Sequence, residues 1–241
     1  GGVPGEWVLA PGADPQRRTL YVHGGAFVMG SPKSHRTLTA QFSALTAAGA
    51  IDPAARELLD GIIAARLAFL VAGGTGAGKT TLLAAALGAV PHGERIICVE
   101  DAPELSPRHP HLVRLVARTA NVEGVGEITL RQLVRQALRM RPDRIVVGEV
   151  RGGEVVDLLA ALNTGHDGGA GTVHANSPTE VPARLEALAA LGGLDRGALH
   201  SQLAAAVQAL VHVGRGPGGR RVEEIALLRR DDSGCCYAVP V

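Results

Sequence analysis

The stretch from residue 66 to residue 85 constrains this chain more than any other. An apolar run at residues 67–71 is typical of a buried strand, and a helical pattern opens at Thr81. Between them lies G-G-T-G-A-G-K-T at residues 73–80, which we call the phosphate loop. It matches G-x-x-x-x-G-K-[ST] in the strand–loop–helix setting that this motif requires. The sequence therefore predicts an α/β protein built around a nucleotide site.

Each position of the phosphate loop has a chemical reason. Glycines let successive backbone N–H groups turn toward phosphate oxygens, and the helix N-terminus adds partial positive charge. We expect Lys79 to reach the β- and γ-phosphates and Thr80 to place its hydroxyl on Mg²⁺. Lys33 and Lys79 are the only lysines of the chain, which makes an unrelated lysine in a glycine-rich turn the weaker interpretation. The predicted nucleotide-binding residues are Gly74, Thr75, Gly76, Ala77, Gly78, Lys79, Thr80 and Thr81.

Composition sets broad limits. A chain of 241 residues with 46% apolar residues suits one large or two small domains, and 2% aromatics implies a core of Leu, Val and Ala. A formal net charge of +1 predicts no specific nucleic-acid partner. Cys98, Cys235 and Cys236 form no metal-binding or disulfide pattern, and a signal peptide or long apolar run is not evident. A cytoplasmic protein is expected.

Residues 1–45 differ in character from the rest. Y-V-H-G-G-A-F-V-M-G-S-P at residues 21–32 resembles the oxyanion-hole turn of hormone-sensitive-lipase-type α/β-hydrolases. A carboxylesterase also needs a nucleophile, but no serine has glycines both two residues before and two residues after it, so the G-x-S-x-G elbow is missing. We expect a catalytically silent hydrolase-like fragment that packs poorly, with carboxylesterase activity as a remote alternative.

Residues 46–241 read as one coherent domain. Asp52 and Pro53 are typical of a helix start. Strands are predicted at 67–71, 95–99, 112–116 (an edge strand), 144–147 and 172–174, and helices at 54–65, from 81, 129–138, 154–162, 179–191 and 199–209. Residues 210–213 and 222–227 flank a Gly/Arg-rich turn at 214–221, which predicts a C-terminal β-hairpin, and 231–241 is expected to be a frayed tail.

The helix expected at 129–138 begins with a capping box, Thr129 and Gln132. Its apolar residues recur at helical spacing, and Arg131, Arg135 and Arg139 form a stripe beside them. The stripe indicates a solvated face or, alternatively, a surface for a neighbouring subunit.

Two acids and one histidine follow predicted strands. Glu100 ends the strand at 95–99, and Glu149 follows the strand at 144–147. The carboxyl ends of parallel strands meet at one edge of the sheet, so both acids are expected near the phosphate loop. Glu149 has the Walker B arrangement, whose carboxylate holds Mg²⁺ through water or polarises water. His174 lies at the end of a predicted strand near flexible glycines; helix-capping acids and a structural histidine are the alternatives.

Four motifs stand in order: G-G-T-G-A-G-K-T-T at 73–81, C-V-E-D-A-P-E-L at 98–105, R-P-D-R-I-V-V-G-E-V-R-G-G-E at 141–154 and G-T-V-H-A-N-S-P at 171–178. Together they resemble the type II/type IV secretion ATPase superfamily, and in particular the CpaF-like motors of Tad pili, over residues 47–230. The resemblance implies a RecA-like P-loop NTPase core, with a mainly parallel sheet flanked by helices. It also implies ATP hydrolysis with Mg²⁺ in a homo-oligomer, a hexamer, at the cytoplasmic face of the inner membrane, where platform proteins of the apparatus are its partners.

The same resemblance implies roles for individual residues. Glu100 would orient or activate water, Glu149 with Thr80 would hold Mg²⁺, and His174 would sense the γ-phosphate. Arg114, Arg118 and Arg151 are candidates for γ-phosphate contacts. The motifs do not decide which glutamate is the base.

An alternative follows from the first 45 residues. Members of the superfamily carry a preceding domain that closes over the nucleotide and contributes arginines, and here the hydrolase-like segment stands in its place. An arginine finger is worth several powers of ten in phosphoryl transfer. The alternative is therefore a nucleotide-binding remnant with little turnover.

Overall fold

The computed structural model describes residues 44–46, 49–216 and 218–241. The hydrolase-like fragment expected at 1–45 lies outside these residues except for its last two positions. Its expected poor packing therefore stays a prediction, and the other described residues belong to the predicted nucleotide-binding domain.

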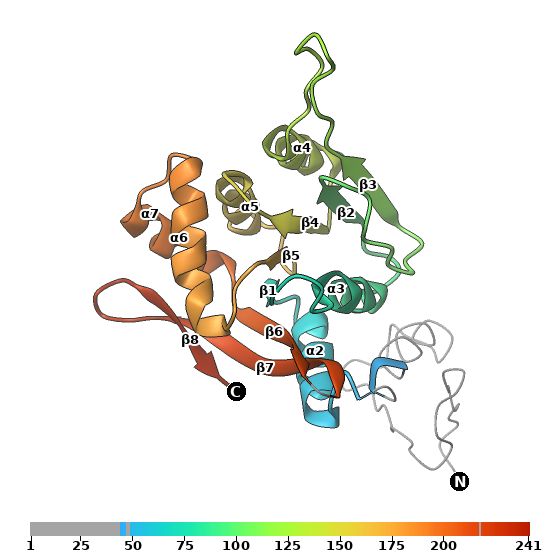
Figure 1. The fold of residues 1–241 in the computed structure, drawn as a ribbon, viewed down its shortest axis with the longest axis vertical. Coiled ribbons are helices and arrows are strands. Elements are labelled where there is room, and N and C mark those ends of the chain that lie inside the picture. Colours follow the sequence, from blue (N-terminus) through green and yellow to red (C-terminus); the bar gives the residue numbers. More distant parts are fainter. Residues whose placement is uncertain (1–43, 47–48, 217) are drawn as a thin grey trace.

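One sheet of eight strands organises this domain, in the order β3-β2-β4-β5-β1-β6-β7-β8 (Figure 1). All pairs from β3 to β6 are parallel, and β6-β7 and β7-β8 are antiparallel. This confirms the predicted α/β class with a mainly parallel sheet. The strands are β1 Phe69–Ala72, β2 Ile96–Glu100, β3 Leu112–Val116, β4 Arg144–Val150, β5 Ala170–Val173, β6 Ala209–Gly216, β7 Gly219–Arg230 and β8 Cys236–Pro240.

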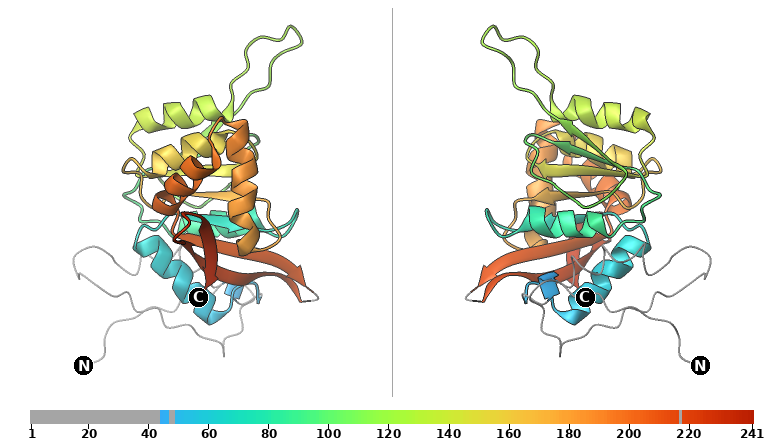
Figure 2. Two further views of the ribbon diagram at one scale, coloured as in Figure 1. Left: turned by 90° about the vertical axis from the view of Figure 1, so that its left-hand side faces the viewer. Right: turned by 90° about the vertical axis from the view of Figure 1, so that its right-hand side faces the viewer.

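Helices cover both faces of the sheet (Figures 1 and 2). One core cluster joins the sheet to α2 and α3, and the other joins it to α4, α5, α6 and α7. Strands β1, β2 and β5 are buried at every residue, which is why their sequences are continuous apolar runs rather than alternating ones. The helices are α2 Pro53–Ala64, α3 Lys79–Gly88, α4 Leu130–Ala137, α5 Glu154–Leu162, α6 Val181–Leu191 and α7 Arg196–Ala206, with short 3₁₀ turns at Leu138–Met140 and Pro178–Glu180.

Local signals at helix starts were predicted correctly. The Asp52 carboxylate accepts a hydrogen bond from the Ala55 N–H at 2.8 Å. The capping box of Thr129 and Gln132 is present in both directions. Helix α3 begins two residues earlier than predicted, at Lys79, because Gly78 adopts a left-handed conformation (φ 103°) at the N-cap and ends the loop there.

The arginine stripe predicted at Arg131, Arg135 and Arg139 is a solvated face only in part. Arg131 Nε and Arg135 Nε donate to the two carboxylate oxygens of Asp157 at 2.6 and 2.7 Å. Asp157 is buried on α5, so these two arginines satisfy a charge that an apolar helix would otherwise bury unpaired. They bind α4 to α5 within one chain. Arg135 and Arg139 are exposed, as a solvated face predicts, whereas Arg131 is half-buried.

The C-terminal region forms more sheet than predicted. The hairpin strands run through the Gly/Arg-rich segment, and their register extends from Ala209–Leu227 to Gly216–Gly219. The expectation of a frayed tail was wrong, because Cys236–Pro240 pairs with β7 as β8. An aspartate turn precedes β8: the Asp231 carboxylate accepts from Ser233 Oγ and from the Cys235 N–H. This D-D-S-G turn was the overlooked signal.

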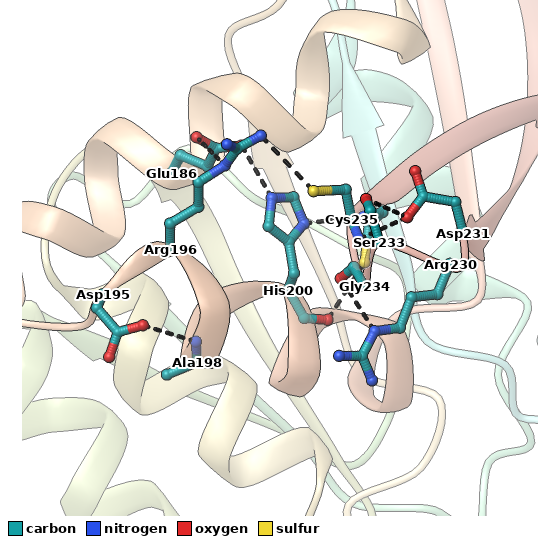
Figure 3. Close-up of polar contacts among 11 residues, drawn as sticks. Glu186, Asp195, Arg196, Ala198, His200, Arg230, Asp231, Ser233, Gly234 and Cys235 are labelled. Carbon is teal, nitrogen blue, oxygen red and sulfur yellow. Dashed lines mark hydrogen bonds and ion pairs between the residues drawn. The ribbon is translucent and has the colours of Figure 1, made fainter.

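A buried histidine anchors β8 to the helical layer (Figure 3). His200 Nδ1 accepts a hydrogen bond from the Cys236 N–H at 2.9 Å, which leaves the ring proton on Nε2. That nitrogen lies 2.9 Å from Glu186 Oε1 on α6. The Cys236 thiol donates to the His200 carbonyl. These contacts connect β8 to α6 and α7.

Between β3 and α4 the chain forms an arm at residues 117–128 that projects from the body of the domain (Figure 2). A bridge between Arg118 and Ile128 closes its base, and the Asn121 carboxamide accepts two backbone N–H groups at its tip. Within the described part of the chain, no helix is long and apolar enough to cross a membrane.

Candidate active site

A cavity of about 210 Å³ lies at the carboxyl ends of the central strands, beside the N-terminus of α3. It brings together the phosphate loop and all three residues predicted to be catalytic, Glu100, Glu149 and His174. Their convergence follows from the parallel sheet, in which β1, β2, β4 and β5 all end on this side. The lining residues are Thr75, Gly76, Lys79, Thr80, Glu100, Asp101, Ala102, Glu104, Gly148, Glu149, Arg151, Thr172 and His174.

The phosphate loop requires glycine at specific positions. Gly73 has a φ of 154°, and a Cβ there would lie 2.3 Å from the Val213 carbonyl oxygen of β6. Gly76 and Gly78 have φ values of 71° and 103°. Because Gly78 has no side chain, the first N–H groups of α3 have no side-chain cap. A helix N-terminus of this kind is suited to an anion.

The predicted nucleotide-binding residues do not all face this cavity. Thr75, Gly76, Lys79 and Thr80 line it, whereas Gly78 and Thr81 line an adjoining cavity that shares Gly76, Lys79 and Thr80 with it. Gly74 and Ala77 line neither of the two cavities. They shape the loop instead: the Ala77 N–H donates to the Gly74 carbonyl at 3.3 Å.

Lys79 is held inside its own loop. Its side chain is 7% exposed, and Nζ donates to the carbonyls of Gly73 and Gly74 at 2.9 and 3.0 Å. Nζ also lies 3.4 Å from His174 Nε2. Burial lowers the pKa of Lys79, opposed by the Glu149 carboxylate and reinforced by the Arg151 guanidinium. A phosphate would offer this ammonium charged acceptors in place of neutral carbonyls.

Glu149 lies between two basic side chains. Its Oε1 is 2.6 Å from His174 Nε2, and its Oε2 pairs with the Arg151 guanidinium. The hydrogen bond with Glu149 raises the pKa of Arg151. Thr172 Oγ1 donates to the Gly148 carbonyl at 2.7 Å and ties β5 to β4 beside this group. The predicted Walker B acid and the predicted histidine are therefore in direct contact.

Glu100 is 2% exposed, and only one of its two carboxylate oxygens accepts hydrogen bonds among the described residues. Its Oε1 accepts from the N–H groups of Glu104 and Leu105 at 3.0 and 2.7 Å. Its Oε2 faces Arg114 Nε at 3.1 Å, yet has no hydrogen bond among the described residues. A Cβ on Gly148 would lie 2.8 Å from Glu100 Cγ, so glycine at this position of β4 makes room for the carboxylate.

The three candidate arginines differ in position. Arg151 lines the cavity. Arg114 does not; it pairs with Glu100 and donates to the Leu105 carbonyl, so it positions Glu100. Arg118 lies on the projecting arm and donates to the Gly126 carbonyl. Of the three, Arg151 alone has a position that fits the predicted phosphate contact.

Two further acids, Asp101 and Glu104, line the cavity and were not chosen as site residues. Burial raises the pKa of Asp101, the carboxylates of Glu154 and Glu149 add to the increase, and Arg151 opposes it. The signal was present, because both acids belong to the E-D-A-P-E run after β2. Of that run, only the strand-terminal Glu100 was predicted to be a site residue.

Residues 29–231 match the sequence profile of the family described as type II/IV secretion system protein. A Mycobacterium tuberculosis protein described provisionally as a conjugal transfer protein is 77% identical over 196 residues, which are 81% of this chain and 56% of the relative.

Two solved structures share the fold. The VirB11 ATPase of the Brucella suis type IV secretion system, solved with sulphate, has a TM-score of 0.64 and 33% identity over 76% of this chain and 53% of its own. The pilus retraction motor PilT with bound ADP has a TM-score of 0.52 and 27% identity over 71% and 49%. The chain thus spans about half the length of these relatives.

Proposed function

This chain belongs to the type II/IV secretion system protein family, and we propose that it is the nucleotide-hydrolysing core of an ATP-driven secretion or pilus-assembly motor. The observation that carries the proposal is the meeting of Lys79, Glu149 and His174 around one cavity at the start of α3. ATP is the proposed substrate. The named ligands of two relatives, sulphate and ADP, agree with a site for phosphate groups.

Binding begins with the phosphate loop. The uncapped N–H groups at the start of α3 would hold phosphate oxygens, and Lys79 would exchange the carbonyls of Gly73 and Gly74 for the β- and γ-phosphates. The exchange is favourable because the ammonium gains the Coulomb attraction of charged phosphate oxygens, which the neutral carbonyls lack.

Thr80 and Glu149 have the chemistry that Mg²⁺ needs. Both line the same cavity and present hard oxygen atoms, and Mg²⁺ is commonly held by one or two protein groups together with phosphate oxygens and water. When bound, the ion would neutralise charge on the β- and γ-phosphates.

The water that attacks the γ-phosphate needs an orienting group. Each of the two glutamates has one buried oxygen without a hydrogen bond among the described residues: Oε1 of Glu149 beside His174, and Oε2 of Glu100 beside Arg114. Because Glu149 is the proposed Mg²⁺ ligand, our choice for the orienting group is Glu100. Its Oε1 is fixed by two backbone N–H groups, which holds the carboxylate in one orientation. Pre-organised groups of this kind lower the barrier because they need no rearrangement during reaction.

His174 would sense whether the γ-phosphate is present in the site. It contacts Glu149 at 2.6 Å and lies 3.4 Å from Lys79, so a γ-phosphate that draws Lys79 away must change its surroundings. Beyond the site, family membership supports a homo-oligomer, proposed to be a hexamer, bound at the cytoplasmic face of the inner membrane to platform proteins. The ordered motifs favour a Tad-type pilus motor as the finer assignment.

A nucleotide-binding protein with little turnover is the second candidate. It is favoured by the state of Arg151, the one arginine that lines the main cavity, because its guanidinium is already paired with Glu149. Unless that pair opens, the described residues supply this cavity with no arginine for the transition state.

The experiment is Mg²⁺-dependent ATP binding and turnover by the whole chain and by Lys79→Ala, with the molecular mass in solution measured on the same samples. Lys33→Ala, which changes the other lysine, is the matched control. Turnover that is lost only in Lys79→Ala supports the motor. Binding without turnover supports the second candidate, and binding that survives Lys79→Ala contradicts both.

A further inference from the structure

The β6–β7 hairpin contacts the phosphate loop at two places. At one end, the Val213 carbonyl of β6 lies against Gly73, 2.3 Å from where a Cβ would be. At the other end, Arg220 of β7 lies against Gly78, with Cδ 3.3 Å from the corresponding position. In Figure 1 the two strands run beside β1 and below α3. The hairpin therefore forms one wall of the loop, although it comes some 140 residues later in the chain.

The contact with Gly78 brings Arg220 to a second cavity, of about 230 Å³. This cavity shares Gly76, Lys79, Thr80 and Glu104 with the main one, so the two are parts of one site. The main cavity alone has Glu100, Glu149 and His174, and the second alone has Gly78, Thr81 and Arg220. The catalytic acids and Arg220 thus line different parts of the site.

This division indicates which phosphate each cavity receives. In a phosphate loop the lysine reaches the β- and γ-phosphates, and the backbone N–H groups hold the α- and β-phosphates. The γ-phosphate belongs with the acids and His174. The α-phosphate then belongs beside Gly78 and Thr81, in the second cavity. We propose that Arg220 binds the α-phosphate of the nucleotide, an inference that rests on the proposed function.

The state of Arg220 supports this assignment. Within the described part of the chain its guanidinium has no hydrogen bond or ion pair, whereas Arg221 next to it lies 3.7 Å from Glu223. Glu104 is the one acid on the lining of the second cavity, and Arg220 and Lys79 give it a net positive charge. A guanidinium can bind two phosphate oxygens at once, which an ammonium cannot do with fixed geometry.

An α-phosphate contact has a distinctive consequence. The α-phosphate is common to ATP and ADP, so Arg220 binds both and does not distinguish them. His174, which faces the γ-phosphate side, does distinguish them. The hairpin would therefore keep the product bound after hydrolysis.

The test measures the dissociation constants of Mg-ATP and Mg-ADP for Arg220→Ala, Arg220→Lys and the control Arg221→Ala. Removing one charge-assisted contact to phosphate should weaken binding of both nucleotides about ten-fold and by the same factor. The lysine variant should recover part of the loss, and Arg221→Ala should stay within about two-fold, since its ion pair with Glu223 is exposed. His174→Ala should weaken ATP binding more than ADP binding.

Two results overturn the inference: unchanged affinities in Arg220→Ala, or a loss confined to ATP, which would move the contact to the γ-phosphate. Lys79→Ala, measured in the same series, separates this inference from the proposed function. If Lys79→Ala abolishes binding and Arg220→Ala does not change it, the Arg220 assignment alone fails. If Lys79→Ala binds normally, the nucleotide site itself is wrong.

Discussion

Strand β4 has an arginine–carboxylate pair at each end, and the two pairs differ in how completely they are bonded. At its start, Arg144 is 1% exposed and every guanidinium nitrogen has a partner. Nε donates to Glu94 at 2.7 Å, and the other two nitrogens donate to the carbonyls of Gly168 and Ile63 at 3.2 and 3.0 Å. At its end, the Arg151 side chain is 62% exposed and, among the described residues, its guanidinium pairs only with Glu149.

The comparison separates a structural pair from a functional one. A buried charge must have all its hydrogen bonds, because an unpaired one costs several kcal/mol. Once those bonds are made, the group has no capacity for a ligand. The pair at the other end faces a cavity and can exchange partners at little cost. The same residue types therefore stabilise the fold at one end of β4 and serve the site at the other.

The largest effect is expected for Arg144→Met. It leaves the carbonyls of Gly168 and Ile63 without this donor, and Glu94 keeps only its half-exposed partner Arg66. We expect the free energy of unfolding to fall by about 3–5 kcal/mol. Urea denaturation of Arg144→Met and Arg151→Met measures the difference, and Arg151→Met should lose less than about 1 kcal/mol. Equal losses would remove the distinction between the two ends.

Glu149→Gln is expected to lower ATP turnover strongly and to change the free energy of unfolding little, in contrast to Arg144→Met. It removes the charge that faces His174 and Arg151, and with it the proposed Mg²⁺ ligand. ATP turnover should fall about 100-fold or more, because the proposed Mg²⁺ that stabilises charge on the transferred phosphate would lose a ligand. The free energy of unfolding should change by less than about 1 kcal/mol. A large stability loss with retained turnover would place Glu149 with Arg144 as a structural residue.

Gly148→Ala tests the space around Glu100. The added methyl group would lie 2.8 Å from Glu100 Cγ, in a part of β4 where the backbone cannot move away easily. We expect a loss of about 1–3 kcal/mol in the free energy of unfolding, together with lower turnover as Glu100 is displaced. The control is Gly61→Ala in α2, where nothing lies within 4 Å. There the substitution should stabilise the protein by up to about 1 kcal/mol.

The smallest effect is expected for the pH dependence of the free energy of unfolding, through Asp101. The raised pKa of Asp101 means that the folded protein keeps a proton that the unfolded chain releases near 3.8. Between 3.8 and the raised value, the free energy of unfolding should therefore decrease as pH increases, and Asp101→Asn should remove this contribution. Carboxyl NMR titration gives the pKa directly. Because Arg151 lowers it, Arg151→Ala should raise it further; a decrease would show that Arg151 does not act on this end of β4.

The sequence predicted the parts of this site that depend on local order. A strand that ends in Glu149 and a loop that starts α3 are local patterns, and the parallel sheet brings their ends together. The contacts of Arg220 and Asp157 depend on packing between distant segments, which a motif does not encode. Strand β8 was missed for a related reason, since its hydrogen bonds come from β7 and from His200 on α7. Glu100 was predicted by position, but its partners Leu105 and Arg114 were not.

The order of the strands has a consequence for synthesis of the protein. Strand β1, which leads into the phosphate loop, pairs only with β5 and β6. During translation β5 and β6 emerge about 100 and 140 residues after β1. The phosphate loop therefore cannot be supported by its neighbouring strands until residue 209 and those after it have been synthesised. Contacts between such distant segments slow folding. A nascent chain that ends before residue 209 is therefore expected not to bind ATP, because β1 then lacks its neighbour β6.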